Sequence, residues 1–301
     1  YYAEALDKIY GEIAPTSSDI LGMIHKEPVG VVGAIIPWNF PMMIGAWKLG
    51  PALAMGNSVV LKPSETASLS LMRMCDLALD AGLPAGVLNA VTGEGAVVGE
   101  VMGLSMDVDV LVFTGSGGTG RRLMEYAARS NMKRVYLELG GKSPNIIFAD
   151  APNLDEAAKV AAGGIFRNSG QVCVAGSRLL VEASIHDDFV AAVAKATEGM
   201  RVGDPLDLTT AIGAVNSEIQ LNQNLGFVET AVTEGGEVIL GGTRILQDTG
   251  GYYMAPTIVT GVTPEATLAQ KEVFGPVLGV TPFTSDDEAV GIANSTVYGL
   301  A

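Results

Sequence analysis

Five short apolar runs alternate with helix-length segments between residues 29 and 140, and this alternation constrains the fold more than any other feature. The runs cover residues 31–36, 58–61, 86–91, 108–114 and 134–139. They are rich in Val, Ile and Leu, as is typical of strands buried on both faces of a parallel sheet. The clearest intervening helix spans 67–81, where Gly82 and Pro84 provide stop signals, and another spans 119–130. The pattern predicts an open, doubly wound α/β sheet.

A second α/β region follows the glycine pair Gly140–Gly141, where we place a domain boundary. Its predicted strands are 144–149 and 177–181, and its predicted helices are 154–168 and 185–200. The stretch from 201 to 301 is predicted to hold short strands between turns rich in Gly and Pro, at 238–240, 257–260 and 277–281.

The composition argues against several classes of function. The chain of 301 residues has 18 Lys and Arg against 33 Asp and Glu, a net charge of −15. Without a basic block, such a chain is a poor ligand for nucleic acids or anionic membranes. Its apolar stretches are interrupted before the roughly 18 residues that a membrane span needs. Two distant cysteines and two distant histidines favour neither a disulfide framework, a metal site nor a histidine base.

Polar side chains lie at or just after the carboxyl ends of the predicted strands, where ligands bind in such sheets. They are Asn39, Lys62, Ser116 and Glu138. The stretch 115–120 reads GSGGTG and satisfies G-x-G-x-x-G between a strand and a helix. It predicts close backbone approach to a pyrophosphate at a helix N-terminus, although a plain tight turn is the alternative. In this motif alone, Glu138 would be the acid that binds the ribose.

Two further segments carry side chains suited to chemistry. Lys62 and Glu65 could bind ribose hydroxyls, and the carboxylate would repel a 2′-phosphate; a solvated loop with a helix cap is the alternative. Cys173 follows a predicted helix and Gly170, and a thiolate is the best nucleophile that this chain offers. A buried structural cysteine is the alternative, and we assign Cys75 to that class.

Glu138 and Asn39 each allow two interpretations. Glu138 precedes flexible glycines and could be a movable base, or it could be an ordinary acid at a strand end. Asn39 lies between Pro37 and Pro41 at a strand end, where its amide could stabilise an oxyanion or simply favour a turn.

Taken together, these segments resemble the NAD(P)-dependent aldehyde dehydrogenase superfamily over the whole chain. The matching stretches are EPVGVVGAIIPWNFP (27–41), GPALAMGNSVVLKPSE (50–65), GLPAGVLNAVTG (82–93), FTGS (113–116), LELGGKSPNIIFADA (137–151), GQVCVAGSRLLV (170–181), KEVFGPVL (271–278) and YGLA (298–301). The segments SNMKRVYLELGGKSPNIIFADAPNLDEA and AGGIFRNSGQVC are most similar to bacterial γ-glutamyl-γ-aminobutyraldehyde dehydrogenases.

The resemblance implies a role for each matching position. Cys173 would be the nucleophile, Glu138 the general base rather than the ribose acid, and Asn39 the oxyanion donor together with the Cys173 backbone N–H. The implied cofactor contacts are Pro37, Trp38, Lys62, Ser64, Glu65, Gly95, Thr114, Gly115, Ser116, Thr119, Leu139, Gly140, Glu272 and Phe274. The implied substrate tunnel is lined by Phe40, Ile44, Trp47, Val172 and Val174. No metal is implied.

The resemblance also implies a fold, a reaction and a setting. Residues 1–28 would form a helix remnant and part of a bridging arm, 29–140 an NAD-binding Rossmann-like domain, and 141–301 a catalytic domain without its C-terminal part. The implied reaction is NAD-dependent oxidation of an aldehyde to the acid, with NADP also compatible. The parent would be a cytoplasmic homo-oligomer, and the chain resembles a piece of it that lacks both ends.

Three alternatives stay open. A CoA-acylating dehydrogenase would pass the acyl group to CoA rather than to water, which Glu138 argues against. A catalytically incompetent nucleotide-binding fragment is the second alternative. A thiol hydrolase or acyltransferase would leave the glycine-rich loop unexplained and has no histidine near Cys173 in sequence. The sequence also departs from the family pattern at Gly117–Gly118, where a polar or acidic residue usually follows FTGS.

Overall fold

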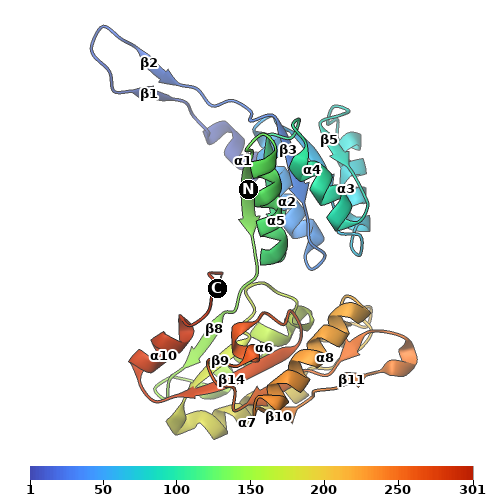
Figure 1. Ribbon diagram of the computed structural model, residues 1–301, viewed down its shortest axis with the longest axis vertical. Coiled ribbons are helices and arrows are strands. Elements are labelled where there is room, and N and C mark those ends of the chain that lie inside the picture. The colour runs from blue at the N-terminus through green and yellow to red at the C-terminus, as the bar shows by residue number, and fades with distance from the viewer. Residues whose placement is uncertain (301) are drawn as a thin grey trace. The chain divides into compact units, whose positions relative to one another are not determined.

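The computed structural model describes residues 1–300 and divides into two compact units, Tyr1–Leu139 and the part from Gly140 onward (Figure 1). Each unit is built around its own five-stranded sheet. The predicted fold class, a doubly wound sheet with a second α/β domain, is confirmed.

The sheet of the first unit is entirely parallel. Its strands are β3 (Val31–Ile35), β4 (Ser58–Lys62), β5 (Leu88–Ala90), β6 (Val110–Thr114) and β7 (Arg134–Glu138). They lie in the order β5-β4-β3-β6-β7. All five predicted strands are confirmed, with ends within two residues of the expected positions. The order reverses direction between β3 and β6, which makes that junction the switch point where ligands bind.

Helices cover both faces of this sheet. They are α2 (Pro41–Ala54), α3 (Leu69–Asp80), α4 (Gly95–Leu104) and α5 (Gly117–Arg129). Helices α2 and α3 pack together, as do α4 and α5. Two separate apolar clusters follow from this arrangement: one joins Val32 and Leu61 to α2 and α3, and the other joins Leu111 and Phe113 to α4 and α5. Alternate side chains of each strand therefore enter different cores.

A hairpin precedes this sheet. After α1 (Tyr2–Ala5) and the 3₁₀ turn η1 (Leu6–Lys8), strands β1 (Glu12–Ala14) and β2 (Gly22–Ile24) pair antiparallel. The hairpin extends away from the rest of the first unit (Figure 1). Its apolar side chains are exposed, with Ile13 at 75% and Met23 at 75%. A two-stranded ribbon without a covering layer is only marginally stable alone.

The second unit has a mixed sheet. Strands β8 (Pro144–Ile147), β9 (Arg178–Glu182), β13 (Thr257–Thr260) and β14 (Val277–Phe283) are parallel, and β10 (Glu237–Leu240) joins antiparallel at one edge. The order is β10-β13-β14-β9-β8. Helices α6 (Leu154–Phe166) and α7 (His186–Glu198) pack against each other and share one core with β9 and β14. These elements were predicted and are confirmed.

The prediction for 201–301 as strands and turns alone was wrong. The stretch also contains helices α8 (Glu218–Thr233), α9 (Thr267–Gln270) and α10 (Asp286–Ala293), with a small ribbon of β11 (Arg244–Ile245) and β12 (Tyr253–Met254). Helix α8 buries Leu221, Asn224, Val228 and Ala231, a narrow stripe interrupted by an amide. That polar member weakened the apolar period on which helix prediction depends. The described residues contain no helix long and apolar enough to cross a membrane.

Candidate active site

The polar side chains predicted at strand ends lie at the carboxyl edge of the first sheet. In the parallel register, Ile35 of β3 is level with Lys62 of β4, and Thr114 of β6 is level with Glu138 of β7. Trp38 and Asn39 lie in the short connection between the end of β3 at Ile35 and the start of α2 at Pro41. The switch point between β3 and β6 is therefore flanked by several of the side chains expected to bind cofactor or substrate.

The GSGGTG stretch forms the N-terminus of α5. Ser116 is the N-cap, and its Oγ accepts a hydrogen bond from the backbone N–H of Thr119 at 3.3 Å. A Cβ at Gly115 would lie 2.5 Å from the Phe113 ring, so that glycine serves packing. A Cβ at Gly118 would meet nothing within 4 Å. This helix start is thus open, carries no acidic residue in its first turn and suits a phosphate.

A second candidate for cofactor binding lies at the carboxyl edge of the first sheet. It is formed by Lys62, Glu65 and Gly95. The Lys62 side chain is 2% exposed, and its Nζ donates to Glu65 Oε2 at 2.8 Å. Glu65 Oε1 accepts from the Gly95 N–H at 3.4 Å. Burial opposes ionisation of Glu65, but the Lys62 hydrogen bond and charge together with the backbone donors outweigh it and lower its pKa. The carboxylate stays ionised, as a ribose ligand that excludes a 2′-phosphate requires.

The residues proposed for the tunnel differ in exposure. Trp47 is 51% exposed on α2, and Phe40 is partly buried against the core of the first unit. Ile44 is 2% exposed and belongs to that core, which includes residues of α2, α3 and the neighbouring strands. A side chain buried there is unavailable to line a tunnel, so we do not retain Ile44 in the proposed site.

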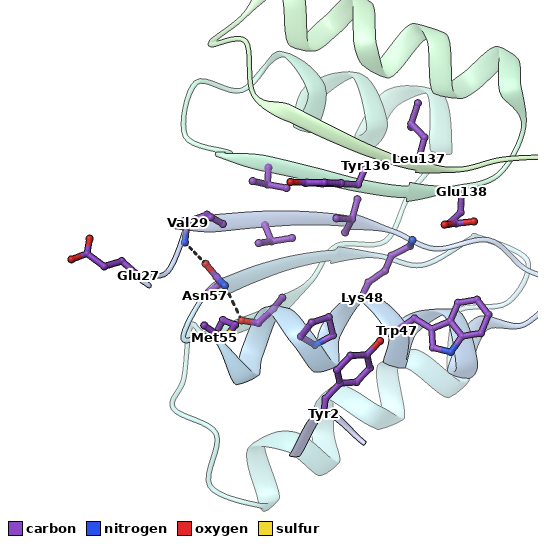
Figure 2. Close-up of a pocket in the computed structure, with 15 residues that line it drawn as sticks. Tyr2, Glu27, Val29, Trp47, Lys48, Met55, Asn57, Tyr136, Leu137 and Glu138 are labelled. Atoms are coloured by element: carbon purple, nitrogen blue, oxygen red, sulfur yellow. Dashed lines mark hydrogen bonds between the residues drawn. The ribbon is translucent and has the colours of Figure 1, made fainter. Parts of the chain in front are cut away.

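A cavity of about 670 Å³ lies against Glu138 in the first unit. Trp47, Lys48 and Tyr136 are among the residues that line it, and Lys48 points toward Glu138 (Figure 2). Burial lowers the pKa of Lys48, and the negative charge of Glu138 opposes that shift. Lys48 was not predicted. A lysine within the otherwise apolar helix that follows PWNFP was the signal that could have identified it.

In the second unit, the glycine pair lets the predicted reactive groups approach. Gly141 N–H donates to Glu272 Oε1 at 3.1 Å. A Cβ at Gly140 would lie 2.0 Å from Glu272 Oε2, and a Cβ at Gly141 would lie 2.3 Å from the Cys173 carbonyl oxygen. Only residues without a side chain fit here. The glycines therefore bring the segments of Cys173 and Glu272 together.

Val172 and Phe274 line the same small pocket as Gly141 and Glu272. Phe274 has a φ of 57°, which is unusual for a bulky residue and marks a constrained loop. Val172 packs partly against the core, whereas Val174 is 48% exposed. Cys173 is partly exposed, Cys75 is buried in α3, and neither is in a disulfide. Burial raises the pKa of Cys75, which makes its thiol a weak nucleophile.

Lys142 is a buried base beside this cluster that the sequence did not single out. It is 1% exposed, and its Nζ has no hydrogen-bond partner among the residues that the structure describes. Burial and the charge of Arg178 lower the pKa of Lys142 to about 7, against the pull of the Glu272 carboxylate. The folded state therefore favours the neutral amine more than the unfolded state does.

We predict that Lys142→Met changes how stability depends on pH. With a folded pKa near 7 and an unfolded pKa of 10.5, the wild-type contribution is fully present above the unfolded value and is lost as pH falls toward 7. Relative to the variant, the wild type should lose on the order of 5 kcal/mol of unfolding free energy across that window. Urea titrations at several pH values measure it, with exposed Lys159→Met as the control. If the unfolding free energies of wild type and Lys142→Met changed with pH in parallel, the prediction would be contradicted.

Comparison with known proteins identifies the class to which this arrangement belongs. The model of the family described as "Aldehyde dehydrogenase family" matches residues 1–301, the whole chain. The chain belongs to the aldehyde dehydrogenase family.

Individual relatives narrow the comparison. Over 302 aligned residues the chain is 50% identical to the "NADP/NAD-dependent aldehyde dehydrogenase PuuC" of Escherichia coli (strain K12), covering all of this chain and 60% of that protein. It is 44% identical to the "Aminoacetaldehyde dehydrogenase" of Pseudomonas aeruginosa, of which it also covers 60%. The crystal structure of the aldehyde dehydrogenase KauB from Pseudomonas aeruginosa matches with a TM-score of 0.97 and 54% identity, over 99% of this chain and 60% of that one. The chain thus spans about three fifths of the length of these relatives.

Proposed function

We propose that this chain carries the cofactor-binding and reacting residues of an enzyme that oxidises an aldehyde to the carboxylic acid with NAD. One observation carries the proposal: the Gly141 N–H donates to the Glu272 carboxylate, and Gly141 lies so close to the Cys173 carbonyl that a Cβ there would be 2.3 Å from its oxygen. The proximity of these two segments supports Cys173 as the nucleophile beside a carboxylate that would hold the nicotinamide riboside. Membership of the aldehyde dehydrogenase family supports the same reaction.

The proposed chemistry begins at Cys173. Its thiolate attacks the aldehyde carbon, forming a C–S bond and an alkoxide, which the Asn39 amide and the Cys173 backbone N–H stabilise. Bound NAD supplies the acceptor for the hydride that leaves this carbon as the thioester forms. Glu138 then takes a proton from water, the hydroxyl adds to the thioester, and the C–S bond breaks to release the acid.

The first unit fits the proposed cofactor. The open N-terminus of α5 at Ser116–Gly118 would take the pyrophosphate, with Thr114, Gly115 and Thr119 around it. Lys62 and Glu65 would take a ribose, assisted by Ser64 and Gly95. We propose that residues 29–140 are the NAD-binding domain and 141–301 the catalytic domain. Pro37, Trp38, Leu139 and Gly140 would complete the cofactor contacts, with Glu272 and Phe274 at the nicotinamide riboside.

Hydrolysis is favoured over transfer to CoA because a carboxylate, Glu138, ends β7 at the sheet edge, where it can activate water. For the substrate we propose an aminoaldehyde or another small aldehyde. Two relatives support this choice: the aminoacetaldehyde dehydrogenase of Pseudomonas aeruginosa, and a gamma-glutamyl-gamma-aminobutyraldehyde dehydrogenase from Burkholderia cenocepacia J2315, whose crystal structure is 51% identical in sequence to this chain. Phe40, Trp47, Val172 and Val174 would form an apolar wall for the substrate.

We also propose that the protein is a cytoplasmic homo-oligomer. The exposed apolar hairpin of β1 and β2 suits pairing with a second copy.

A direct test follows nicotinamide absorbance while the purified chain meets NAD and a panel of aldehydes that includes aminoaldehydes. We expect aldehyde-dependent formation of NADH together with the acid in equal amounts. Formation of acyl-CoA instead, only when CoA is present, would favour the acylating alternative. NAD binding without turnover would favour the alternative of a nucleotide-binding fragment.

Cofactor choice gives a separate prediction. Replacing Glu65 by Gln removes the charge that would repel a 2′-phosphate while keeping a side chain that can hydrogen-bond. We expect the Kd for NADP to fall relative to that for NAD by about tenfold, the scale of one close like-charge contact. Isothermal titration with both cofactors measures the ratio, and Glu100→Gln, on the exposed side of α4, is the control. A ratio equal to that of the wild type would show that Glu65 does not select the cofactor.

A further inference from the structure

The backbone turns left-handed immediately before Cys173. Asn168, Ser169 and Gly170 have φ angles of 52°, 55° and 70°. Residues with a Cβ rarely adopt this region, and two in succession persist only where their surroundings impose it. Helix α6 ends at Phe166, so the helix does not account for the turn. Contacts outside the helix must therefore stabilise the left-handed turn.

The side chain of Gln171 holds this turn from within. It is 5% exposed, and its Nε2 donates to the carbonyl of Asn168 at 3.1 Å. Its Oε1 accepts from the backbone N–H of Asn216 at 2.8 Å. Its own backbone N–H also donates to the Asn168 carbonyl at 3.1 Å. One amide therefore closes the turn and fixes it to the segment that precedes α8.

Two further contacts leave the turn no room to relax. Ser169 Oγ donates to the carbonyl of Gly213 at 2.8 Å, a second tie to the same segment. A Cβ at Gly170 would lie 2.0 Å from the Gly275 carbonyl oxygen, so the turn packs directly on the loop that carries Phe274. The turn, the segment 213–216 and the 272–275 loop thus form one packed unit, and Cys173 follows it by three residues.

We propose that Gln171 is a positioning residue: its amide holds the left-handed turn and thereby fixes the main chain from which Cys173 presents its thiol and backbone N–H. The inference rests on the proposed function in treating Cys173 as the nucleophile. Gln171 itself touches no reacting atom in this role. Its effect is confined to reactions in which the direction of attack and the oxyanion donor matter.

Two reactions of the Cys173 thiol distinguish correct positioning of the thiol from its simple accessibility to a reagent. With iodoacetamide the thiolate displaces iodide and forms a thioether, and no oxyanion develops. With p-nitrophenyl acetate the thiolate adds to the carbonyl, an oxyanion forms, and its collapse expels p-nitrophenolate and leaves an acetyl thioester. Neither reaction needs a cofactor. Both rates are proportional to the fraction of Cys173 present as thiolate. The acetylation rate divided by the alkylation rate is therefore independent of that fraction and reports how the thiol and the oxyanion donor are positioned.

The experiment compares wild type, Gln171→Met and Gln171→Glu. We expect Gln171→Met to lower the acetylation rate at least about tenfold and to change alkylation by no more than about threefold. Gln171→Glu keeps the acceptor for Asn216 but sets a carboxylate oxygen against the Asn168 carbonyl. In Gln171→Glu the ratio of acetylation rate to alkylation rate should therefore rise as pH falls from about 8 to about 5. The protonated Glu side chain can then donate to the Asn168 carbonyl, as the Gln171 amide does. Exposed Gln247→Met is the matched control, and peptide mass distinguishes Cys173 from Cys75.

An unchanged ratio of the two rates in Gln171→Met would overturn the proposal, including the case in which both rates fall together. If wild-type Cys173 is not acetylated at all, the proposed function fails and the clamp is tested by amide hydrogen exchange. Faster exchange in Gln171→Met confined to 168–173 and 213–216 would then support the clamp. Unchanged exchange there would refute it.

Discussion

Replacing Cys173 by alanine will abolish NADH formation from every aldehyde, with a loss of about 10⁴-fold or more, while NAD still binds. The physical reason is that no other side chain in the site can form the covalent intermediate, and removal of a nucleophile typically costs that much. The cofactor contacts proposed for Lys62, Glu65 and Ser116 do not depend on the thiol. Turnover and the Kd for NAD, measured on the same preparation, check the two halves of the prediction.

Cys75→Ala is the matched control for this change. Cys75 is the other cysteine, it is buried in α3, and its thiol has a raised pKa. Its replacement should cost some stability through a small cavity and leave the catalytic rate per folded molecule unchanged. If Cys75→Ala lost turnover and Cys173→Ala retained it, the assignment of the nucleophile would be wrong.

Most strands and helices of the fold were predictable because each has a simple pattern of apolar residues, either a short continuous run or a helical period. Strands β3, β4 and β6 are short runs of Val, Ile and Leu buried on both faces, and such runs have few other stable structures. Helix α8 departs from such a pattern, since its buried stripe includes Asn224, which is 0% exposed. The α8 stripe depends on contacts that the sequence does not display: Gln220, one turn before Asn224, donates to the Val273 carbonyl at 3.0 Å.

The candidate site was predictable only where a motif carries its own chemistry. Side chains such as Cys173 and Glu138 were selected because their functional groups suit the reaction. Gln171 and Lys142 were passed over because their importance depends on tertiary contacts: a backbone N–H 45 residues away for Gln171, and complete burial for Lys142. Likewise, the Gly140–Gly141 pair was interpreted as a flexible link, whereas the structure shows that close approach of Glu272 and Cys173 requires it.

Replacing Glu138 by glutamine should stop the reaction after the first turnover. If Glu138 activates water, its amide cannot accept the proton, so the acyl group stays on Cys173 while hydride transfer still occurs once. We expect a burst of NADH equal to the number of sites and a steady-state rate lower by about 10²- to 10⁴-fold. Rapid mixing measures the burst, and the mass of the Cys173 peptide shows the retained acyl group. The exposed carboxylate Glu125, on α5, provides the matched control, since Glu125→Gln should keep both phases. Loss of the burst would contradict this role and would show that Glu138 is needed for a step that forms the thioester. Its negative charge near Lys48 is one way in which it could act there.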